Sequence, residues 1–127
     1  MKGQRVLVVD DDADTVQLLT SLLHTAGYRV LTALDPSQAV MQAQRERPVL
    51  ILTDILMPAG GGLSVLKRLK MSAKTGIIPI IVLTASQDPE IEAQSLAAGA
   101  TRFIRKPWDN AALLEAIKAV LSGEGER

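Results

Sequence analysis

Five short apolar runs alternate with five segments of helical spacing along the chain, and this alternation restricts the fold more than any other feature of the sequence. The apolar runs are Arg5–Val9, Tyr28–Ala33, Val49–Thr53, Ile77–Leu83 and Thr101–Ile104. Four of them are rich in Val, Ile or Leu without strict alternation of polar and apolar residues. This composition is typical of parallel strands that are covered on both faces.

Apolar residues in the intervening segments recur every three or four positions, as they do along one face of a helix. In chain order they are Val16, Leu19, Leu23 and Ala26; Ala39, Val40 and Ala43; Leu63, Leu66 and Leu69; Ile91, Ser95, Leu96 and Ala98; and Leu113, Leu114, Ile117, Val120 and Leu121. Gly27 and Gly99 are placed to end the first and fourth helices. Parallel strands need helical crossovers, so the sequence predicts an α/β fold, a (βα)5 doubly wound five-stranded parallel sheet.

Length and composition indicate a single globular domain and exclude several function classes. The chain has 127 residues, and its 14 basic residues balance 14 acidic ones, so no overall field attracts nucleic acid or anionic lipid. Because there is no cysteine, disulfides, thiolate zinc sites and cysteine nucleophiles are excluded. No apolar run approaches the roughly 18 residues of a membrane span, and the N-terminus lacks the apolar region of a signal peptide. We expect a cytoplasmic domain over residues 1–122, with 123–127 as a polar tail or the start of a linker.

Three adjacent carboxylates, Asp10, Asp11 and Asp12, follow the first apolar run, and Asp14 lies two residues further on. Two carboxylates about 5 Å apart repel each other by roughly 3 kcal/mol at an effective dielectric constant near 20. A cation, a helix N-terminus or solvent must offset this repulsion. We interpret Asp12 as the N-cap of the first helix and Asp14 as a first-turn residue that is favoured by the helix dipole.

Polar side chains also follow three other predicted strands. They are Asp54 in "LILTDILMP", Thr84 in "IIVLTAS" and Lys106 in "FIRKPWD". Ligands of open α/β sheets bind at the carboxyl ends of the strands, where all these residues should meet. The carboxylates of Asp10, Asp11 and Asp54 would form an oxygen-only site suited to Mg²⁺. Without a cation, this cluster is expected to be strained, with the pKa of one carboxyl raised.

Phosphoryl transfer commonly uses four groups together: a bound metal, a carboxylate, a hydroxyl and a lysine. The metal and the lysine neutralise charge on the phosphoryl oxygens, and a carboxylate can act as the nucleophile that forms an acyl phosphate. Asp54 is the best candidate for the nucleophile because it ends the middle strand alone, facing the other groups.

These separated motifs resemble those of the response-regulator receiver domains of two-component signalling, and the resemblance extends to about Ser122. The matching segments are "VVDDD" with Asp10 and Asp11, "DILMP" with the phosphoacceptor Asp54, "LTA" with Thr84 and Ala85, and "KP" with Lys106 and a following cis proline bond. The resemblance implies the flavodoxin-like strand order 2-1-3-4-5. It also implies that a histidine kinase or phosphotransfer protein donates a phosphoryl group to Asp54 in a Mg²⁺-dependent reaction.

The resemblance further assigns roles around the phosphoacceptor. Asp11, Asp54 and the Leu56 carbonyl would bind Mg²⁺ directly, with Asp10 acting largely through water, while the backbone of Leu56 and Ala85 would contact the phosphoryl group. Phe103 would change rotamer as Thr84 moves toward that group, which alters the face built by the fourth helix, fifth strand and fifth helix. A downstream effector protein or a C-terminal effector domain would respond to this face. Such a protein is a switch that catalyses its own phosphorylation and slow dephosphorylation, rather than an ordinary enzyme.

Several positions depart from the pattern of the family. Gly60, Gly61 and Gly62 replace a segment that often carries an acid, and we interpret them as a turn because no Gly-Lys-Ser/Thr follows. Winged-helix response regulators carry two acids after "GA" and a basic residue late in the last helix, which pair across a dimer. The residues at these positions here are Thr101, Arg102 and Gly123, so that dimer is disfavoured. Trp108 is interpreted as a staple for the last helix, and His24 as a surface or helix-end residue.

Two alternative functions compete with the phosphoacceptor switch. A haloacid-dehalogenase-type phosphatase also uses an aspartate nucleophile and Mg²⁺, but it requires Asp-x-Asp-x-Thr after the first strand, and Asp14 stands where the threonine should be. A phosphorylation-independent docking receiver would tolerate loss of the site, whereas all five site positions are intact.

The lifetime of an acyl phosphate depends on side chains that orient or exclude the attacking water. Leu56, two residues after the phosphoacceptor, and Ser86, two after Thr84, border the path of that water. Leu56 offers only apolar bulk and Ser86 is short, so we expect slow self-hydrolysis.

Overall fold

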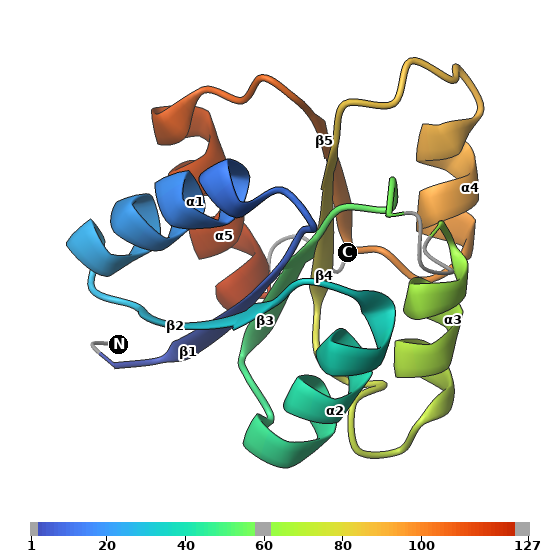
Figure 1. The fold of residues 1–127 in the computed structure, drawn as a ribbon, viewed down its shortest axis with the longest axis horizontal. Helices are drawn as coiled ribbons and strands as arrows, with labels where there is room; N and C mark the ends of the chain where they lie inside the picture. Colours follow the sequence, from blue (N-terminus) through green and yellow to red (C-terminus); the bar gives the residue numbers. More distant parts are fainter. Residues whose placement is uncertain (1–2, 58–61, 124–127) are drawn as a thin grey trace.

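The computed structural model describes residues 3–57 and 62–123 and has one five-stranded parallel sheet with helices on both faces (Figure 1). Its elements are β1 (Arg5–Val9), α1 (Ala13–Thr25), β2 (Arg29–Ala33), α2 (Pro36–Glu46), β3 (Leu50–Thr53), α3 (Ser64–Met71), β4 (Ile80–Thr84), α4 (Ile91–Ala97), β5 (Arg102–Arg105) and α5 (Asn110–Leu121). The strand order is β2-β1-β3-β4-β5. The predicted α/β class and the flavodoxin-like order are therefore confirmed.

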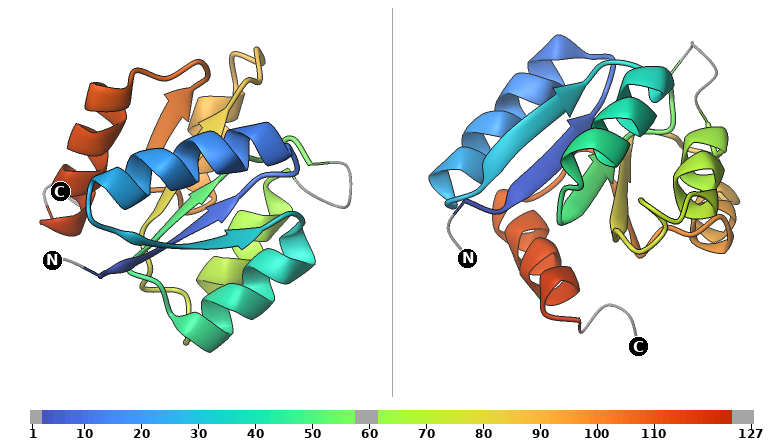
Figure 2. Two further views of the ribbon diagram at one scale, coloured as in Figure 1. Left: turned by 60° about the vertical axis from the view of Figure 1, so that its left-hand side comes forward. Right: turned by 90° about the horizontal axis from the view of Figure 1, so that it is seen from below.

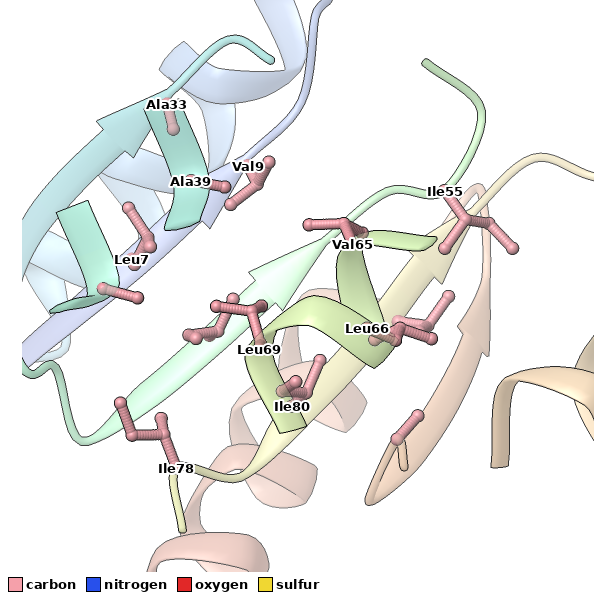
Figure 3. Close-up of a cluster of buried hydrophobic side chains, with 14 of the residues drawn as sticks. Leu7, Val9, Ala33, Ala39, Ile55, Val65, Leu66, Leu69, Ile78 and Ile80 are labelled. Carbon is pink, nitrogen blue, oxygen red and sulfur yellow. The ribbon is translucent and has the colours of Figure 1, made fainter. Parts of the chain in front are cut away.

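The sheet separates two apolar clusters, each covered by its own helices. α1 and α5 pack on one face, while α2, α3 and α4 pack on the other (Figures 1 and 2). On the second face, Leu66 and Leu69 of α3 lie beside Ile80 of β4 (Figure 3). All residues of β3 and β4 are buried. This burial on both faces is the reason that their sequences lack polar and apolar alternation.

Aspartate residues begin three of the helices by accepting hydrogen bonds from first-turn N–H groups. Asp12 accepts from the Asp14 N–H at 3.3 Å, Asp35 from the Gln38 N–H at 2.8 Å, and Asp109 from the Ala112 N–H at 2.8 Å. The N-cap role predicted for Asp12 is confirmed. Each cap satisfies a donor that the helix itself leaves unpaired.

The fourth strand begins three residues later than the sequence suggested. β4 starts at Ile80, whereas the apolar run begins at Ile77, whose side chain is 86% exposed. Residues 77–79 belong to the connection from α3, because hydrogen bonds hold that connection against the end of the helix and Pro79 has no N–H to donate to a ladder. β2, β3 and β5 each begin one residue later than predicted, at Arg29, Leu50 and Arg102.

Other predictions fall outside the described residues. The turn interpretation of Gly60 and Gly61 does so, as does most of the tail or linker predicted for 123–127. The domain boundary at residue 122 therefore stays a prediction. Among the helices of the described chain, none is long and apolar enough to cross a membrane.

Gly99, which follows α4, cannot take a side chain without strain. Its φ is +117°, and an added Cβ would lie 2.6 Å from the Lys70 Cγ of α3. We expect Gly99→Ala to lower the free energy of unfolding by at least about 2 kcal/mol in urea denaturation, since backbone strain and crowding add. Gly123→Ala is the matched control, because its φ is +86° but nothing lies within 4 Å of the added Cβ. Equal losses in the two variants would show that contact with Lys70 does not restrict residue 99.

Candidate functional site

Four strands deliver the predicted site residues to one edge of the sheet. Asp10, Asp54 and Thr84 are buried, with exposed fractions of 3%, 5% and 0%, and Lys106 is partly buried. Backbone bonds between neighbouring strands position three of them. The Asp10 N–H donates to the Ala33 carbonyl at 3.1 Å, the Asp54 N–H to the Val9 carbonyl at 2.9 Å, and the Lys106 N–H to the Thr84 carbonyl at 2.8 Å. The predicted convergence at the carboxyl ends of the strands therefore occurs in the fold.

The ammonium of Lys106 lies between the two buried carboxylates. Its Nζ is 2.7 Å from Asp10 Oδ2 and 2.9 Å from Asp54 Oδ2. The three residues come from β1, β3 and the end of β5, so the ion pairs join strands that are not all neighbours in the sheet. A cation supplied by the chain itself thus offsets the repulsion between Asp10 and Asp54.

The other carboxylate oxygens of these two residues accept backbone N–H groups. Asp54 Oδ1 accepts from the N–H of Ile55 at 2.6 Å and from that of Leu56 at 2.9 Å. Asp10 Oδ1 accepts from the Asp12 N–H at 2.9 Å. Both carboxylates are therefore fixed in orientation from two sides.

These contacts decide the charge state of Asp54. Burial alone would raise the pKa of Asp54, but the Leu56 N–H, the Lys106 ammonium and the Thr84 hydroxyl together lower it below its ordinary value. Burial would likewise lower the pKa of Lys106, but the carboxylates of Asp10 and Asp54 raise it. The expected rise in the pKa of one carboxyl is therefore wrong for Asp54, because the nearest cation is a lysine of the protein. Asp54 is an anion at neutral pH, as a nucleophile must be.

The clustered acids after β1 are accommodated in three different ways. Asp10 is ion-paired with Lys106, Asp11 is exposed to solvent, and Asp12 caps α1. The Thr15 hydroxyl, which donates to Asp12 Oδ2 at 2.7 Å, is the main cause of a lowered pKa of Asp12. This use of Asp12 as a cap also removes the second aspartate that a haloacid-dehalogenase-type site would need.

The oxygen-only donor set of Asp10, Asp11 and Asp54 fits a hard cation such as Mg²⁺. Among residues 3–57 and 62–123, however, no three acidic or histidine side chains are grouped as they would be around a metal. The reason is that Lys106 holds Asp10 and Asp54 while Asp11 is exposed. The chemistry of the donors therefore fits magnesium, and Lys106 is the cation that the two buried carboxylates contact in this arrangement.

Arg105, which the sequence analysis did not single out, connects Phe103 to the loop after β4. Its guanidinium lies over the Phe103 ring, 5.0 Å from the centroid, and also donates a hydrogen bond to the Ser86 carbonyl. Phe103 itself packs against the cluster under α3 and α4. A signal was present, because residues two apart on a strand share a face, so a cation two positions after an aromatic residue can stack on it.

The positions proposed to tune phosphoryl lifetime lie at the rim of the site. Leu56 is 51% exposed, and Ser86 is partly buried. The Ser86 N–H donates to the Thr84 hydroxyl oxygen at 3.3 Å. The Ser86 carbonyl accepts a hydrogen bond from Arg105, so the backbone of Ser86 is held at both its N–H and its carbonyl. Ala85, between Thr84 and Ser86, is exposed.

Trp108 packs against the cluster under α1 and α5, and its Nε1 donates to Asn110 Oδ1 at 2.8 Å. This placement agrees with the predicted staple at the start of α5. The Lys106–Pro107 bond is cis, as the resemblance implied. His24 lies exposed in the last turn of α1, away from the site, as predicted.

Fold and site together define a class of small α/β switch domains that carry a buried carboxylate at the middle strand of the sheet. The sequence model of the response regulator receiver domain family matches residues 6–118. The chain therefore belongs to this family and is a receiver domain of two-component signalling, in which the phosphoacceptor role follows from the family.

Known relatives agree with this membership. The chain is 37% identical to the phosphate regulon transcriptional regulatory protein PhoB of Pseudomonas aeruginosa, over 98% of this chain and 55% of PhoB. It is 34% identical to Protein PilH of Pseudomonas aeruginosa, over 94% of this chain and 98% of PilH. The chain thus spans about half the length of PhoB and nearly all of PilH.

A solved structure of a related receiver domain has the same fold. The receiver domain of the sensor histidine kinase PA1611 from Pseudomonas aeruginosa superposes with a TM-score of 0.87 and is 30% identical, over 94% of this chain and 98% of that chain. That structure is described with a magnesium ion coordinated in its active site cleft.

Replacing Lys106 tests its part in holding the buried carboxylates. We expect Lys106→Met to lower the free energy of unfolding by about 2 kcal/mol at pH 7 without added metal, because two buried carboxylates lose their counter-ion. Lys67→Met, which removes an exposed lysine of α3, is the matched control and should change stability by less than about 0.5 kcal/mol.

The same ion pairs predict how the stability of the parent protein depends on pH. The raised pKa of Lys106 means that its contribution is complete below about pH 10 and is lost as pH rises through the folded-state value. The lowered pKa of Asp54 means that its contribution is present above about pH 4 and is lost as pH falls through the folded-state value. Unfolding curves of the parent recorded across this range would contradict the ion-pair account if its stability did not fall at either end.

Proposed function

We propose that Asp54 is the residue that accepts the phosphoryl group, from a histidine kinase or a phosphotransfer protein. The observation that carries this proposal is the environment of the Asp54 carboxylate, which is buried, anionic and held by Lys106 and two backbone N–H groups. No other acidic residue of the described chain combines burial on the middle strand with these contacts.

In the proposed reaction, an oxygen of the Asp54 carboxylate attacks the phosphorus of a phosphorylated histidine. The P–N bond breaks, its electron pair returns to the imidazole, and an acyl phosphate forms on Asp54. No proton has to leave Asp54, because the lowered pKa keeps it ionised. The ammonium of Lys106 and the hydroxyl of Thr84 then neutralise or bind the added oxygens, with the backbone of Leu56 and Ala85 as further contacts.

The groups that would hold Mg²⁺ are the carboxylates of Asp10, Asp11 and Asp54 and the carbonyl of Leu56. When bound, this ion supplies positive charge that balances the developing charge on the phosphoryl oxygens. Asp10 also has a role of its own, because it holds the Lys106 ammonium 2.7 Å away beside Asp54.

We infer that the switch operates through β5. Thr84 moves toward the phosphoryl group, Phe103 turns into the space that is freed, and the surface of α4, β5 and α5 changes. Arg105 links these events, since it contacts both the Phe103 ring and the Ser86 carbonyl next to the site. The partner of this surface would be an effector protein or effector domain, and a cytoplasmic location remains part of this proposal.

Labelling by a small acyl-phosphate donor tests the assignment of Asp54. With acetyl phosphate and Mg²⁺, we expect a phosphoryl mass increment in the parent protein and none in Asp54→Asn, because the amide is not a competent nucleophile. Asp109→Asn is the control, since asparagine also caps helices well and α5 should stay intact. Equal labelling of Asp54→Asn and the parent would exclude Asp54 as the acceptor.

Phosphoryl lifetime tests the proposed roles of Leu56 and Ser86. We expect the double variant Leu56→Asn with Ser86→Glu to lose phosphate about tenfold faster, a change in barrier of roughly 1.4 kcal/mol, because polar side chains can orient the attacking water. Leu34→Asn, at another half-exposed leucine outside the site, should decay like the parent. Dephosphorylation of the double variant at the parental rate would remove both residues from the control of lifetime.

A further inference from the structure

Two large apolar side chains stand almost fully in solvent at the edge of the sheet opposite the phosphoacceptor. Met71 at the end of α3 is 85% exposed, and Ile77 in the connection to β4 is 86% exposed. They are the most exposed large hydrophobic residues of the described chain. The segment that carries them, where α3 ends and the chain turns back into β4, lies at the bottom of Figure 1.

The connection that carries Ile77 is firmly held. The Gly76 N–H donates to the Ser72 carbonyl at 2.7 Å, and the Lys70 Nζ donates to the carbonyls of Gly76 and Ile78 at 3.0 and 2.8 Å. A Cβ on Gly76 would lie 2.9 Å from the Ser72 carbonyl oxygen, so the turn is also closely packed. The Ile77 side chain is therefore fixed in an outward position by the loop that bears it.

An apolar groove of about 350 Å³ lies beside Ile77. Its walls come from the start of β3, the start of β4 and the end of α5. The large apolar residues that line it are Pro48, Val49, Ile77, Ile78, Pro79, Val120 and Leu121. The groove is large enough to receive a bulky side chain from another molecule.

Basic residues are numerous on the elements that adjoin Met71 and Ile77 in the chain and in space. Five exposed basic residues lie on α2, on α3 and in the loops that follow these helices. They are Arg45 on α2, Arg47 after it, Lys67 and Arg68 on α3, and Lys74 after α3. Among the described residues of α2, α3 and the α3–β4 connection, Glu46 is the only acid, and it is paired with Arg5 at 3.0 Å. α2 and α3 lie side by side on one face of the sheet (Figures 1 and 2).

We call Arg45, Arg47, Lys67, Arg68, Met71, Lys74 and Ile77 the basic apolar face. Cations near the C-termini of helices are stabilised by the helix dipole, which accounts for some of the charge. The dipole gives no reason to hold Met71 and Ile77 in solvent, where each loses the benefit of burial. Exposed apolar residues with a charged rim are typical of a protein interaction site.

We propose that the basic apolar face binds an acidic segment of a partner protein. A large apolar residue of that segment would enter the groove beside Ile77, and its carboxylates would pair with the surrounding lysines and arginines. The groove favours a peptide over a membrane surface, since a cavity between β3, β4 and α5 accepts a single side chain. This interaction goes beyond the phosphoacceptor role and does not depend on it, because the face lies at the opposite edge of the sheet from Asp54.

The proposal can be tested with the full chain and a synthetic peptide in which glutamates flank leucine and phenylalanine. We expect saturable binding in ¹⁵N NMR titrations, with shifts confined to the groove residues and the α3–β4 connection. The double variant Met71→Ser with Ile77→Ser should weaken binding about tenfold or more, and Lys67→Glu with Lys74→Glu should do the same. Both positions of each pair are exposed, so all variants should fold.

Matched controls are available on other parts of the surface. Leu34→Ser removes a half-exposed leucine before α2, and Lys118→Glu reverses an exposed charge on α5, and neither should change the affinity by more than about twofold. A peptide with lysines in place of the glutamates should not bind.

Four results would overturn the proposal. The first is the absence of saturable peptide binding, and the second is an affinity for the peptide that the Met71→Ser with Ile77→Ser variant leaves unchanged. The third is binding to phosphatidylglycerol vesicles that this variant abolishes, while the peptide fails to bind. The fourth is a concentration-dependent dimer that this variant abolishes, again while the peptide fails to bind. The third would identify the face as a membrane-binding surface, and the fourth as a contact between copies of this chain.

Discussion

The ion pairs of Lys106 with Asp10 and Asp54 are the contacts on which the site depends. They hold two buried carboxylates side by side, which would otherwise repel each other, and they join β1, β3 and the end of β5 at one point. The same ammonium helps to lower the pKa of Asp54 and so keeps it ionised. One ammonium group therefore stabilises the fold, helps to keep Asp54 ionised and places a positive charge beside the proposed nucleophile.

The direction of the helices gives the molecule two different ends. Each helix runs back against its strand, so helix N-termini meet at the carboxyl edge of the sheet and C-termini at the other edge. Acidic caps such as Asp12, Asp35 and Asp109 lie at the first edge, next to the site, whereas Arg45 and Arg68 lie in last turns near the second. The caps and the last-turn cations thus place opposite charges at opposite edges of the sheet, which the zero net charge does not reveal.

β5 links the chemistry to the surface of the protein. Lys106 directly follows this strand and reaches the carboxylates, while Arg105 within it contacts both the Phe103 ring and the Ser86 carbonyl in the loop after β4. The strand lies at the edge of the sheet, so its outer side adjoins α4 and α5 without a further strand. A small shift at Thr84 can therefore reach the exterior through a short path of contacts.

Several features follow from the amino-acid sequence alone: the fold class, the parallel sheet, the positions of the helices, the N-cap at Asp12 and the identities of the residues at the strand ends. These features depend on the spacing of apolar residues and on bonds within a few positions, which are local. The tertiary structure was needed to show that Lys106 pairs with Asp10, 96 positions away in the chain, and helps to lower the pKa of Asp54. It also decided that Ile77 lies outside β4 and that Arg105 bonds to the Ser86 carbonyl. The physical reason is that charge interactions and burial depend on distances in space, and these are set when strands far apart in the sequence become neighbours in the sheet.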